Sequence, residues 1–465
     1  MAFSLEKFGM NRKMLLINGI MLFAAFITIL NQTLLTPALP SIMRDMNIDA
    51  ATAQWLTTGF MLVNGIMIPI TAYLIDRFTT RQLFFVSMTL FAAGTALAAA
   101  STTFPMILAS RLLQAAGAGV MMPMGQTIML LTLPRQYRGF GMGLIGLVIG
   151  VAPAVGPVIS GLVVEAYGWH ILFAAMVPLT LLTIVIAYFF LENMGESTNI
   201  TLDMPSVVLS TLGFGGLLYS FSALGSSGFT ALVAVTLLIG VVSLILFIRR
   251  QLHMEEPLLK VDILKNRRFA LSVILTMLVQ AALNIGPVLN PIYLQTIRGF
   301  GASVSGFIML PASIAMLIMS PVSGRLFDKF GPRRLAIPGL FLASVFTIPM
   351  VLMDENTSLY YLAFVYTIRT IGLSLVNMPL NTWGLNSLSN RVMAHGTAIG
   401  NTFRQVAGSL GCAILITVMS IVVANCADPA TIASQIHGIN VAYMGATLMM
   451  TTAFVLTILF VKEER

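Results

Sequence analysis

Residues 324–334 read GRLFDKFGPRR and follow directly on a long apolar run. A related stretch, LIDR at residues 74–77, ends an earlier apolar run, so that Asp76 precedes Asp328 by 252 residues. Arg111 and Arg369, each inside a later apolar run, repeat at a similar distance of 258 residues. Acidic and basic residues at matching places predict two halves of related structure.

The whole chain is poor in charge. Of its 465 residues, 57% are hydrophobic and only 9% are charged. Soluble proteins carry roughly 25% charged residues, so this chain has too little polar surface for an ordinary soluble enzyme. Uncharged runs of about 20 residues, enough for a helix to cross ~30 Å of hydrocarbon, recur along its length. Because backbone groups in lipid must bond to one another, these runs predict an all-α polytopic membrane protein rather than a barrel.

The apolar runs divide the chain into segments. We predict fourteen spans, at residues 14–36, 54–75, 82–100, 105–131, 140–165, 170–191, 205–223, 229–249, 269–296, 303–324, 336–353, 359–385, 396–423 and 439–461. Residues 1–191 then form a six-helix N-terminal half, and residues 269–465 form a six-helix C-terminal half. Residues 192–268 hold an inserted helix pair and a charged linker. The first run exceeds a signal-peptide core in length, so we expect it to remain as the first span.

The basic residues predict the orientation of these spans. With the N-terminus inside the cell, twenty of the 25 Lys and Arg residues fall in cytoplasmic segments, two fall outside, and three fall within spans. Cytoplasmic loops of membrane proteins carry such an excess. We therefore expect both termini in the cytoplasm. The net charge of +8 then reflects topology rather than nucleic-acid binding.

Small residues follow one face of two predicted spans. The fifth span carries Gly139, Gly143, Gly146, Gly150, Pro153, Pro157 and Gly161, and the thirteenth carries Gly396, Gly400, Gly408 and Gly411. Such faces let helices approach closely in lipid. Plain helix packing explains each stripe alone. Their matching places in the two halves favour a pair of gate helices that slide.

Several motifs taken together resemble a known family. They are NQTLL at residues 31–35 with ALP at 38–40, the loop around Asp76 and Arg77, RLLQAAG at 111–117, Gly156-Pro157, and NTFRQ at 401–405. Over nearly its whole length the chain resembles the major facilitator superfamily, and within it the fourteen-span drug:proton antiporters of the EmrB and QacA type. AQWLTT at residues 53–58 and HGT at 395–397 resemble the lincomycin-resistance, LmrB-like branch of Gram-positive bacteria.

The resemblance implies alternating access to a central cavity between the two halves, in a bacterial plasma membrane. It also implies a conformational switch made of Asp76, Arg77, Asp328, Arg333, Gly150, Gly156 and Pro157. A carboxylate at the end of one helix can dock on the positive N-terminus of another, here the starts of spans thirteen and five. Such a contact contributes ~0.3–2 kcal/mol. Loop residues that merely mark topology are the alternative.

One expected acid is missing from the first span. Drug:proton antiporters of this type usually carry an Asp where this chain has Asn31, and an amide cannot titrate. No carboxylate falls at mid-membrane in any predicted span. The candidates for proton coupling are therefore Glu165, as the acid nearest the predicted cavity, and then Asp76 and His395. For Glu165, a cap at the outer membrane interface is the alternative.

Three arginines, Arg111, Arg369 and Arg404, lie within spans without an acidic partner. A charge in the bilayer costs at least ~2.5–3.5 kcal/mol, so each should face a partner or a wet cavity. Asn31 and Arg111 lie at the same predicted depth, which predicts an Asn–Arg contact. Backbone carbonyls and water are the alternative partners. Arginines facing the cavity would make it net positive and would favour neutral, zwitterionic or anionic amphiphiles.

Uncharged polar side chains complete the predicted cavity. Gln280 and Asn284 are separated by four residues, as are Asn377 and Asn381, so each pair shares a helix face. The candidate lining residues are Asn31, Gln32, Arg111, Gln114, Gln280, Asn284, Arg369, Asn377, Asn381, Arg404 and Gln405. Interhelical hydrogen bonding is the competing explanation for each of them.

These features predict a multidrug efflux transporter that couples export of amphiphiles to proton entry. A dedicated exporter or flippase of an amphiphilic lipid or lipopeptide is a second interpretation, and a non-transporting membrane receptor is a third. The sequence contains neither a Walker loop nor a His and Cys metal-ligand cluster, so we expect no enzyme, cofactor or metal. The expected partners are small amphiphilic substrates, protons and the lipid bilayer, and the expected state is a monomer.

Overall fold

The computed structural model describes residues 12–48, 50–194, 203–254, 256–428 and 430–461, and the regular elements in these ranges are helices. The all-α prediction is therefore confirmed for the described residues. The long helices are α1 (Arg12–Met46), α2 (Ala50–Arg77), α3 (Thr80–Ala99), α4 (Phe104–Thr132), α5 (Arg138–Tyr167), α6 (Trp169–Phe190), α7 (Met204–Ser227), α8 (Ala231–His253), α9 (Arg267–Pro291), α10 (Ala302–Val351), α11 (Leu359–Ser374), α12 (Asn377–Asn386), α13 (Met393–Ala424) and α14 (Ile432–Phe460).

The count of membrane spans differs from the prediction. Within the described residues, 12 helical segments are long and apolar enough to cross a bilayer, rather than fourteen. One of the 12, Val304–Val351, lies in α10, where the backbone breaks at Gly331 with a φ of 77°. Glycine adopts this φ without steric cost, so two helices meet at a kink where the sequence predicts a loop. The 30-residue helix α5 is not among the 12 segments.

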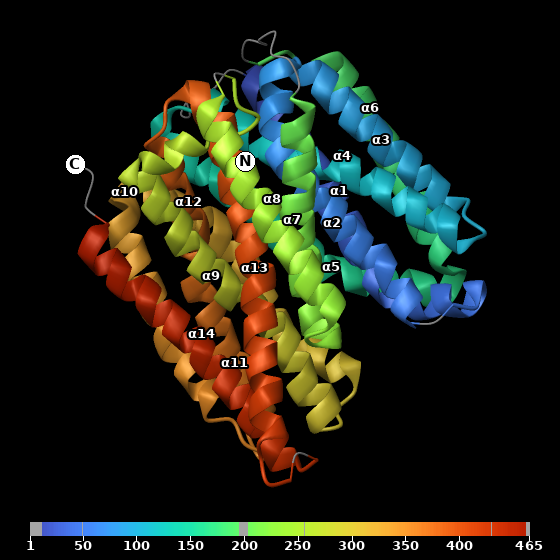
Figure 1. Cartoon of the computed structure of the whole chain (residues 1–465), viewed down its shortest axis with the longest axis vertical. Coiled ribbons are helices and arrows are strands. Elements are labelled where there is room, and N and C mark those ends of the chain that lie inside the picture. The colour runs from blue at the N-terminus through green and yellow to red at the C-terminus, as the bar shows by residue number, and fades with distance from the viewer. Residues whose placement is uncertain (1–11, 49, 195–202, 255, 429, 462–465) are drawn as a thin grey trace.

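The helices form two bundles joined by a helix pair. Figure 1 shows α1–α6, in blue to teal, on one side and α9–α14, in yellow to red, on the other. Helices α7 and α8 run along the front between the bundles. Helix α7 packs against both α2 and α13, so the inserted pair touches both bundles. Leu218 of α7 fills the space left by the missing side chain of Gly65 on α2.

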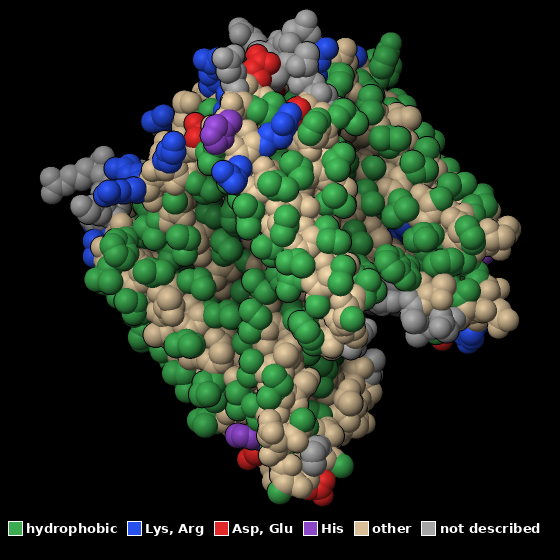
Figure 2. Space-filling view, viewed as in Figure 1, with side chains coloured by type: hydrophobic (Ala, Val, Ile, Leu, Met, Phe, Trp, Pro, Cys, Tyr) green, Lys and Arg blue, Asp and Glu red, His purple; other side chains and the backbone are tan. Residues whose placement is uncertain are grey.

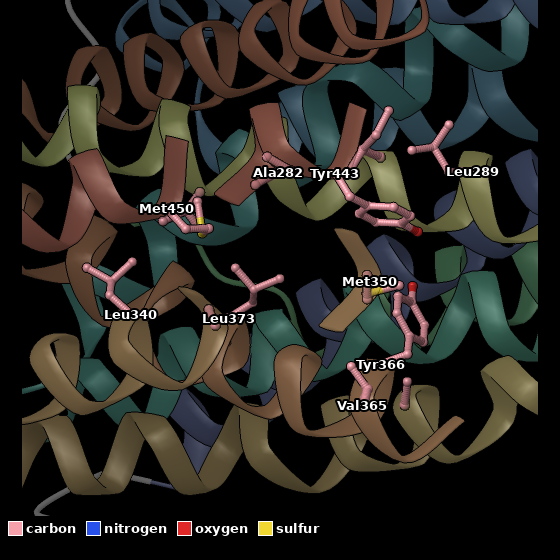
Figure 3. Close-up of a cluster of buried hydrophobic side chains, with 14 of the residues drawn as sticks. Ala282, Leu289, Leu340, Met350, Val365, Tyr366, Leu373, Tyr443 and Met450 are labelled. Carbon is pink, nitrogen blue, oxygen red and sulfur yellow. The ribbon is translucent and has the colours of Figure 1, made fainter. Parts of the chain in front are cut away.

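A buried apolar cluster holds the second bundle together. Its side chains come from α9, α10, α11 and α14, and Figure 3 shows Ala282, Leu340, Leu373, Tyr443 and Met450 converging from these helices. The Tyr443 hydroxyl, itself buried, donates a 2.6 Å hydrogen bond to the Asn290 Oδ1 atom. The cluster therefore fixes α9 relative to α14, and Gln280 and Asn284 lie outside it.

Ionic contacts clamp the inserted pair. Asp203 caps α7 by accepting a 3.1 Å hydrogen bond from the Ser206 N–H, and the Arg250 guanidinium of α8 donates two 2.7 Å bonds to the Asp203 carboxylate. The Arg250 bonds hold the pKa of Asp203 well below its usual range. Near the end of α8, Gln251 accepts a 3.1 Å bond from the Leu259 N–H of the linker. The linker is thus tied to the end of α8.

The outer surface separates into an apolar flank and one basic end. Figure 2 shows hydrophobic side chains over the flank and Lys and Arg side chains gathered toward the upper end. On α8, Leu232, Leu238 and Ile245 are each more than half exposed, as expected for side chains that face lipid. We call the end that carries Arg135, Arg325 and Arg391, at the turns before α5, inside α10 and before α13, the basic end.

Candidate functional site

A polar cavity of about 200 Å³ lies between the two bundles. Helices α1, α2, α4 and α5 line it from one side, and α9, α12 and α13 line it from the other. Its polar lining residues are Thr28, Gln32, Asn64, Gln280, Asn284, Asn377, Asn401, Arg404 and Gln405. Met61, Met122 and Met378 contribute flexible apolar surface beside them. The cavity therefore combines many amide groups with a deformable apolar wall.

Arg404 is the one charged side chain among the described lining residues. It is only 6% exposed, and its Nη2 atom donates to the Asn401 Oδ1 atom on the same helix. Its Nη1 atom has no hydrogen-bond partner among the described residues. A buried guanidinium with an unpaired N–H face is costly, so this atom marks a position where a ligand can contribute.

The other two embedded arginines lie away from the cavity in their own hydrogen-bond networks. Arg111 is 1% exposed and donates to Asn31 Oδ1 at 2.8 Å and to Gln114 Oε1 at 2.6 Å, with its guanidinium 4.3 Å from the Phe60 ring centroid. The predicted Asn31–Arg111 contact is therefore present, and it is internal to the first bundle.

Arg369 of α11 is equally buried, at 1% exposure. Its Nε atom donates to the Thr347 Oγ1 atom at 3.2 Å, and its Nη2 atom donates to the Ala282 carbonyl oxygen. A backbone carbonyl, the alternative to an acidic partner, is thus one of the two partners of Arg369. Both arginines hold helices together within a bundle.

The predicted lining residues divide into two groups. Gln32, Gln280, Asn284, Asn377, Arg404 and Gln405 line the cavity, whereas Asn31, Arg111, Gln114, Arg369 and Asn381 do not. The second group is buried within a single bundle. The sequence predicts how deep a residue lies along a helix but not which way the helix is rotated, so it does not separate the two groups. Thr28, Asn64 and Asn401 line the cavity but were not predicted to do so. The clue for Asn401 was its i, i+3 spacing from Arg404.

Hydrogen bonds between the bundles begin directly beside the cavity. Asn401 of α13 donates a 2.8 Å bond from Nδ2 to Gln126 Oε1 of α4. One turn nearer the basic end, the hydroxyls of Thr127 and Thr397 are 2.7 Å apart. These pairs connect α4 to α13 and separate the cavity from the basic end.

At the basic end, Asp328 docks on the start of α5. Its carboxylate accepts 2.8 Å hydrogen bonds from the Gly139 and Phe140 N–H groups, which the first turn of α5 leaves without intrahelical partners. The guanidinium of Arg325 lies 4.6 Å from the Phe140 ring centroid. The geometry is that of a negative charge on a helix N-terminus, across the interface between the bundles.

Asp76, at the matching place in the first bundle, makes a different contact. Its Oδ2 atom lies 2.9 Å from the Nε2 atom of His395, a buried residue in the first turn of α13. The other ring nitrogen, Nδ1, accepts a 3.3 Å hydrogen bond from the Lys260 N–H in the linker. An imidazole that accepts at Nδ1 carries its proton on Nε2 and donates it to Asp76. Two separate proton-coupling candidates, Asp76 and His395, thus form one pair.

Glycines bring α5 against α10 across the bundle interface. A Cβ atom on Gly139 would lie 2.6 Å from the Gly324 carbonyl oxygen, and one on Gly143 would lie 2.6 Å from the Ser320 carbonyl oxygen. Gly150 faces Met316 of α10 in the same way. In α13, by contrast, Gly408 packs on Asn284 and Gly411 on Ala281, both in α9 of the same bundle. These glycines of α5 therefore pack between the bundles, whereas these glycines of α13 pack within one bundle.

The remaining predicted residues take other positions. Gly156 of α5 packs on Thr33 of α1 within the first bundle, and Pro157 follows it in the same helix. Arg333 donates a 3.4 Å bond to the Ile458 carbonyl oxygen of α14, and Arg77 ends α2 beside Asp76. Glu165 is exposed near the end of α5 and is not among the residues that line the cavity.

Comparison with known proteins identifies the family of this chain. The model of the family described as Major Facilitator Superfamily matches residues 21–412. The chain belongs to the major facilitator superfamily. Its family and its relatives are transporters rather than enzymes, which agrees with the absence of catalytic motifs from the sequence.

Two relatives from Bacillus subtilis (strain 168) extend over nearly the whole transporter. The uncharacterised MFS-type transporter YcnB is 42% identical over 463 residues, covering 99% of this chain and 98% of the relative. The lincomycin resistance protein LmrB is 39% identical over 440 residues, covering 92% of each chain. Among solved structures, the human organic anion transporter MFSD10 superposes with a TM-score of 0.70, over 96% of this chain and 100% of that one. At 13% identity, that likeness shows the fold alone.

Proposed function

We propose that this transporter exports amphiphilic drugs through the central cavity by alternating access, in exchange for protons. The observation that carries the proposal is the polar cavity between two bundles whose mutual hydrogen bonds gather at the basic end. Its similarity to the lincomycin resistance protein LmrB and to the multidrug transporter protein MdtP supports drugs as substrates.

The proposal includes an orientation and a span count. The basic end faces the cytoplasm, in keeping with the excess of Lys and Arg in cytoplasmic loops, so both termini are cytoplasmic. The chain crosses the bacterial plasma membrane fourteen times, since α5 spans and α10 contains two spanning helices joined at Gly331. Residues 1–191 and 269–465 are the two moving halves. Residues 192–268, which hold α7, α8 and the linker, bridge them.

In this orientation we propose that the state is closed toward the cytoplasm. The contacts of Asp328 with α5 and of Asp76 with His395 close the cytoplasmic side, and we call them together the cytoplasmic gate. Opening toward the cytoplasm must break both. Release of substrate to the outside and reloading from the inside then follow from the rocking of one half against the other.

We propose that the Asp76–His395 pair carries the coupled proton. Histidine is the side chain that changes charge nearest neutral pH, and here it joins α2 to α13. A proton added to Nδ1 displaces the hydrogen bond from the Lys260 N–H, because two N–H groups then face each other. Gain or loss of a proton therefore changes a contact that must break when the gate opens. Glu165 is exposed and shows no such connection between the bundles among the described residues.

The test is transport by purified protein in proteoliposomes. With the cytoplasmic end facing the bath and an acidic lumen, an amphiphilic drug without a basic amine should accumulate in the lumen against its gradient, and a protonophore should abolish the accumulation. Export driven by an imposed sodium gradient but not by a proton gradient would contradict proton coupling. Absence of flux for lincomycin and for a panel of amphiphilic drugs would contradict export.

A further inference from the structure

Among the described residues that line the cavity, Arg404 is a cation and none is acidic. We propose that Arg404 binds the carboxylate of the substrate, so that the transporter accepts amphiphiles with a single negative charge. This inference rests on the proposed export function and adds to it the chemical class of the substrate.

The three embedded arginines differ in how many hydrogen-bond acceptors the protein offers to their guanidinium groups. The guanidinium groups of Arg111 and Arg369 donate to side-chain amide, hydroxyl and backbone carbonyl oxygens within one bundle, away from the cavity. Arg404 has one such acceptor, Asn401, and its Nη1 atom is left without a partner among the described residues. It is also the arginine that lines the cavity. The positive cavity predicted from three arginines is therefore reduced to a single site.

The surroundings of Arg404 favour an anion over a cation. The polar groups that share the cavity are amides and a hydroxyl, such as Gln32, Asn284 and Asn377, and no described lining residue is acidic. A cationic substrate would meet Arg404 without a compensating carboxylate. A carboxylate would supply the missing acceptor and the missing counter-charge at once, and the planar guanidinium matches its two oxygens.

The shape of the site suits the head of an amphiphile. Its volume of about 200 Å³ is below the roughly 300–1,000 Å³ of pockets that enclose whole drug-sized ligands, and it fits a charged head group. Gly408, one turn beyond Arg404 on α13, leaves room for the Asn284 amide to lie against that helix. Met61 and Met122, on the facing bundle, offer adaptable apolar surface to the adjoining chain of the ligand.

The site is also connected to a hydrogen bond between the two bundles. Asn401 accepts from Arg404 through Oδ1 and donates through Nδ2 to Gln126 of the opposite bundle. An anion in the cavity competes with the Asn401 Oδ1 atom for the guanidinium N–H groups of Arg404. It therefore weakens the contact that holds the Asn401 side chain in place. Binding at Arg404 therefore acts on a hydrogen bond that must break when the cytoplasmic side opens.

Matched probes test the inference. Dansyl-norleucine is a monoanionic amphiphile, its carboxamide is the neutral counterpart, and its amide with a quaternary ammonium amine is cationic. Fluorescence titration of the purified protein gives binding, and proteoliposome flux gives transport. We expect the wild type to bind the carboxylate about tenfold or more tightly than the carboxamide, as charge-assisted hydrogen bonds imply. Arg404→Gln should remove this ratio, and Arg404→Lys should keep part of it.

The neighbouring residue supplies the control. Gln405→Met changes an adjacent lining side chain without changing charge, so it should shift the three probes alike and leave their ratio intact. A wild type that binds the carboxylate no better than the carboxamide, or an Arg404→Gln protein that keeps the preference, would overturn the inference. Transport of the carboxamide and the cation without any preference would leave the proposed export standing. Binding of the carboxylate without flux of any probe would overturn export and leave the anion site standing.

Discussion

The two halves of this transporter place an aspartate at the same point of the repeat and use it differently. Asp328 accepts two hydrogen bonds from the backbone at the start of α5, whereas Asp76 faces the imidazole of His395 at the start of α13. The Asp328 contact can change charge only at its own carboxylate, whereas the Asp76 contact has a second titratable side chain, the imidazole. In the function we propose, the Asp328 contact holds the gate and the Asp76–His395 contact also responds to protons.

The largest effect is expected from blocking the Asp328 contact sterically. In Gly139→Ala, the new Cβ atom would lie 2.5 Å from Asp328 Oδ1 and 2.6 Å from the Gly324 carbonyl oxygen, so α5 and α10 must separate. Overpacking costs roughly 1–3 kcal/mol, and we expect export to fall about tenfold or more. Gly161→Ala in the same helix is the matched control, because its Cβ atom finds no atom within 4 Å. Equal export by the two variants would show that close packing here is unimportant.

A smaller effect is expected from removing the charge of Asp328. Asp328→Asn keeps one acceptor for the start of α5 and loses the charge–dipole attraction, which contributes about 1 kcal/mol. Export should fall roughly fivefold, by the same factor with and without a proton gradient. Flux measured under both conditions checks this. A loss confined to gradient-driven flux would assign the proton to Asp328 and reverse the comparison.

The smallest effect concerns a third aspartate, remote from the gate. Because the Arg250 guanidinium lowers the pKa of Asp203 in the folded state, the stability that this carboxylate contributes is present above its unfolded pKa of ~3.9 and is lost as the pH falls below it. Between about pH 5 and pH 3, the wild type should lose slightly more thermal stability than Asp203→Asn. The melting temperature in detergent measures this. If the melting temperatures of the two proteins fall in parallel, the Asp203–Arg250 contact does not contribute this stability. Export at neutral pH should be the same for both proteins and shows that each is folded.

The sequence predicts the helices and some contacts of the site, but it does not predict which side chains face the cavity. Hydropathy predicts the helices because it depends on features local to the chain, and the repeated Asp and Arg positions predict two halves. Helix depth suffices to predict the Asn31–Arg111 contact and the docking of Asp328 at the start of α5. Depth does not give rotation about the helix axis. For this reason the sequence cannot distinguish Arg404, which faces the cavity, from Arg369, which faces a backbone carbonyl.

Contacts between distant segments are the other limit. No spacing rule relates Asp76 to His395, which are 319 residues apart, or either of them to the linker at Lys260. The sequence therefore yields Asp76 and His395 as separate candidates. The same limit applies to Asn64, which becomes a lining residue only because α2 turns that face toward the opposite bundle.

The central claim is that a proton at the Asp76–His395 pair drives export. The direct measurement compares accumulation of an exported amphiphile without a basic amine under an imposed proton gradient with its downhill flux in the same proteoliposomes, for the wild type and His395→Gln. Glutamine offers an N–H to Asp76 but cannot titrate. The account predicts that His395→Gln keeps downhill flux within a few-fold of the wild type and loses nearly all gradient-driven accumulation. Full gradient-driven accumulation by His395→Gln would contradict it.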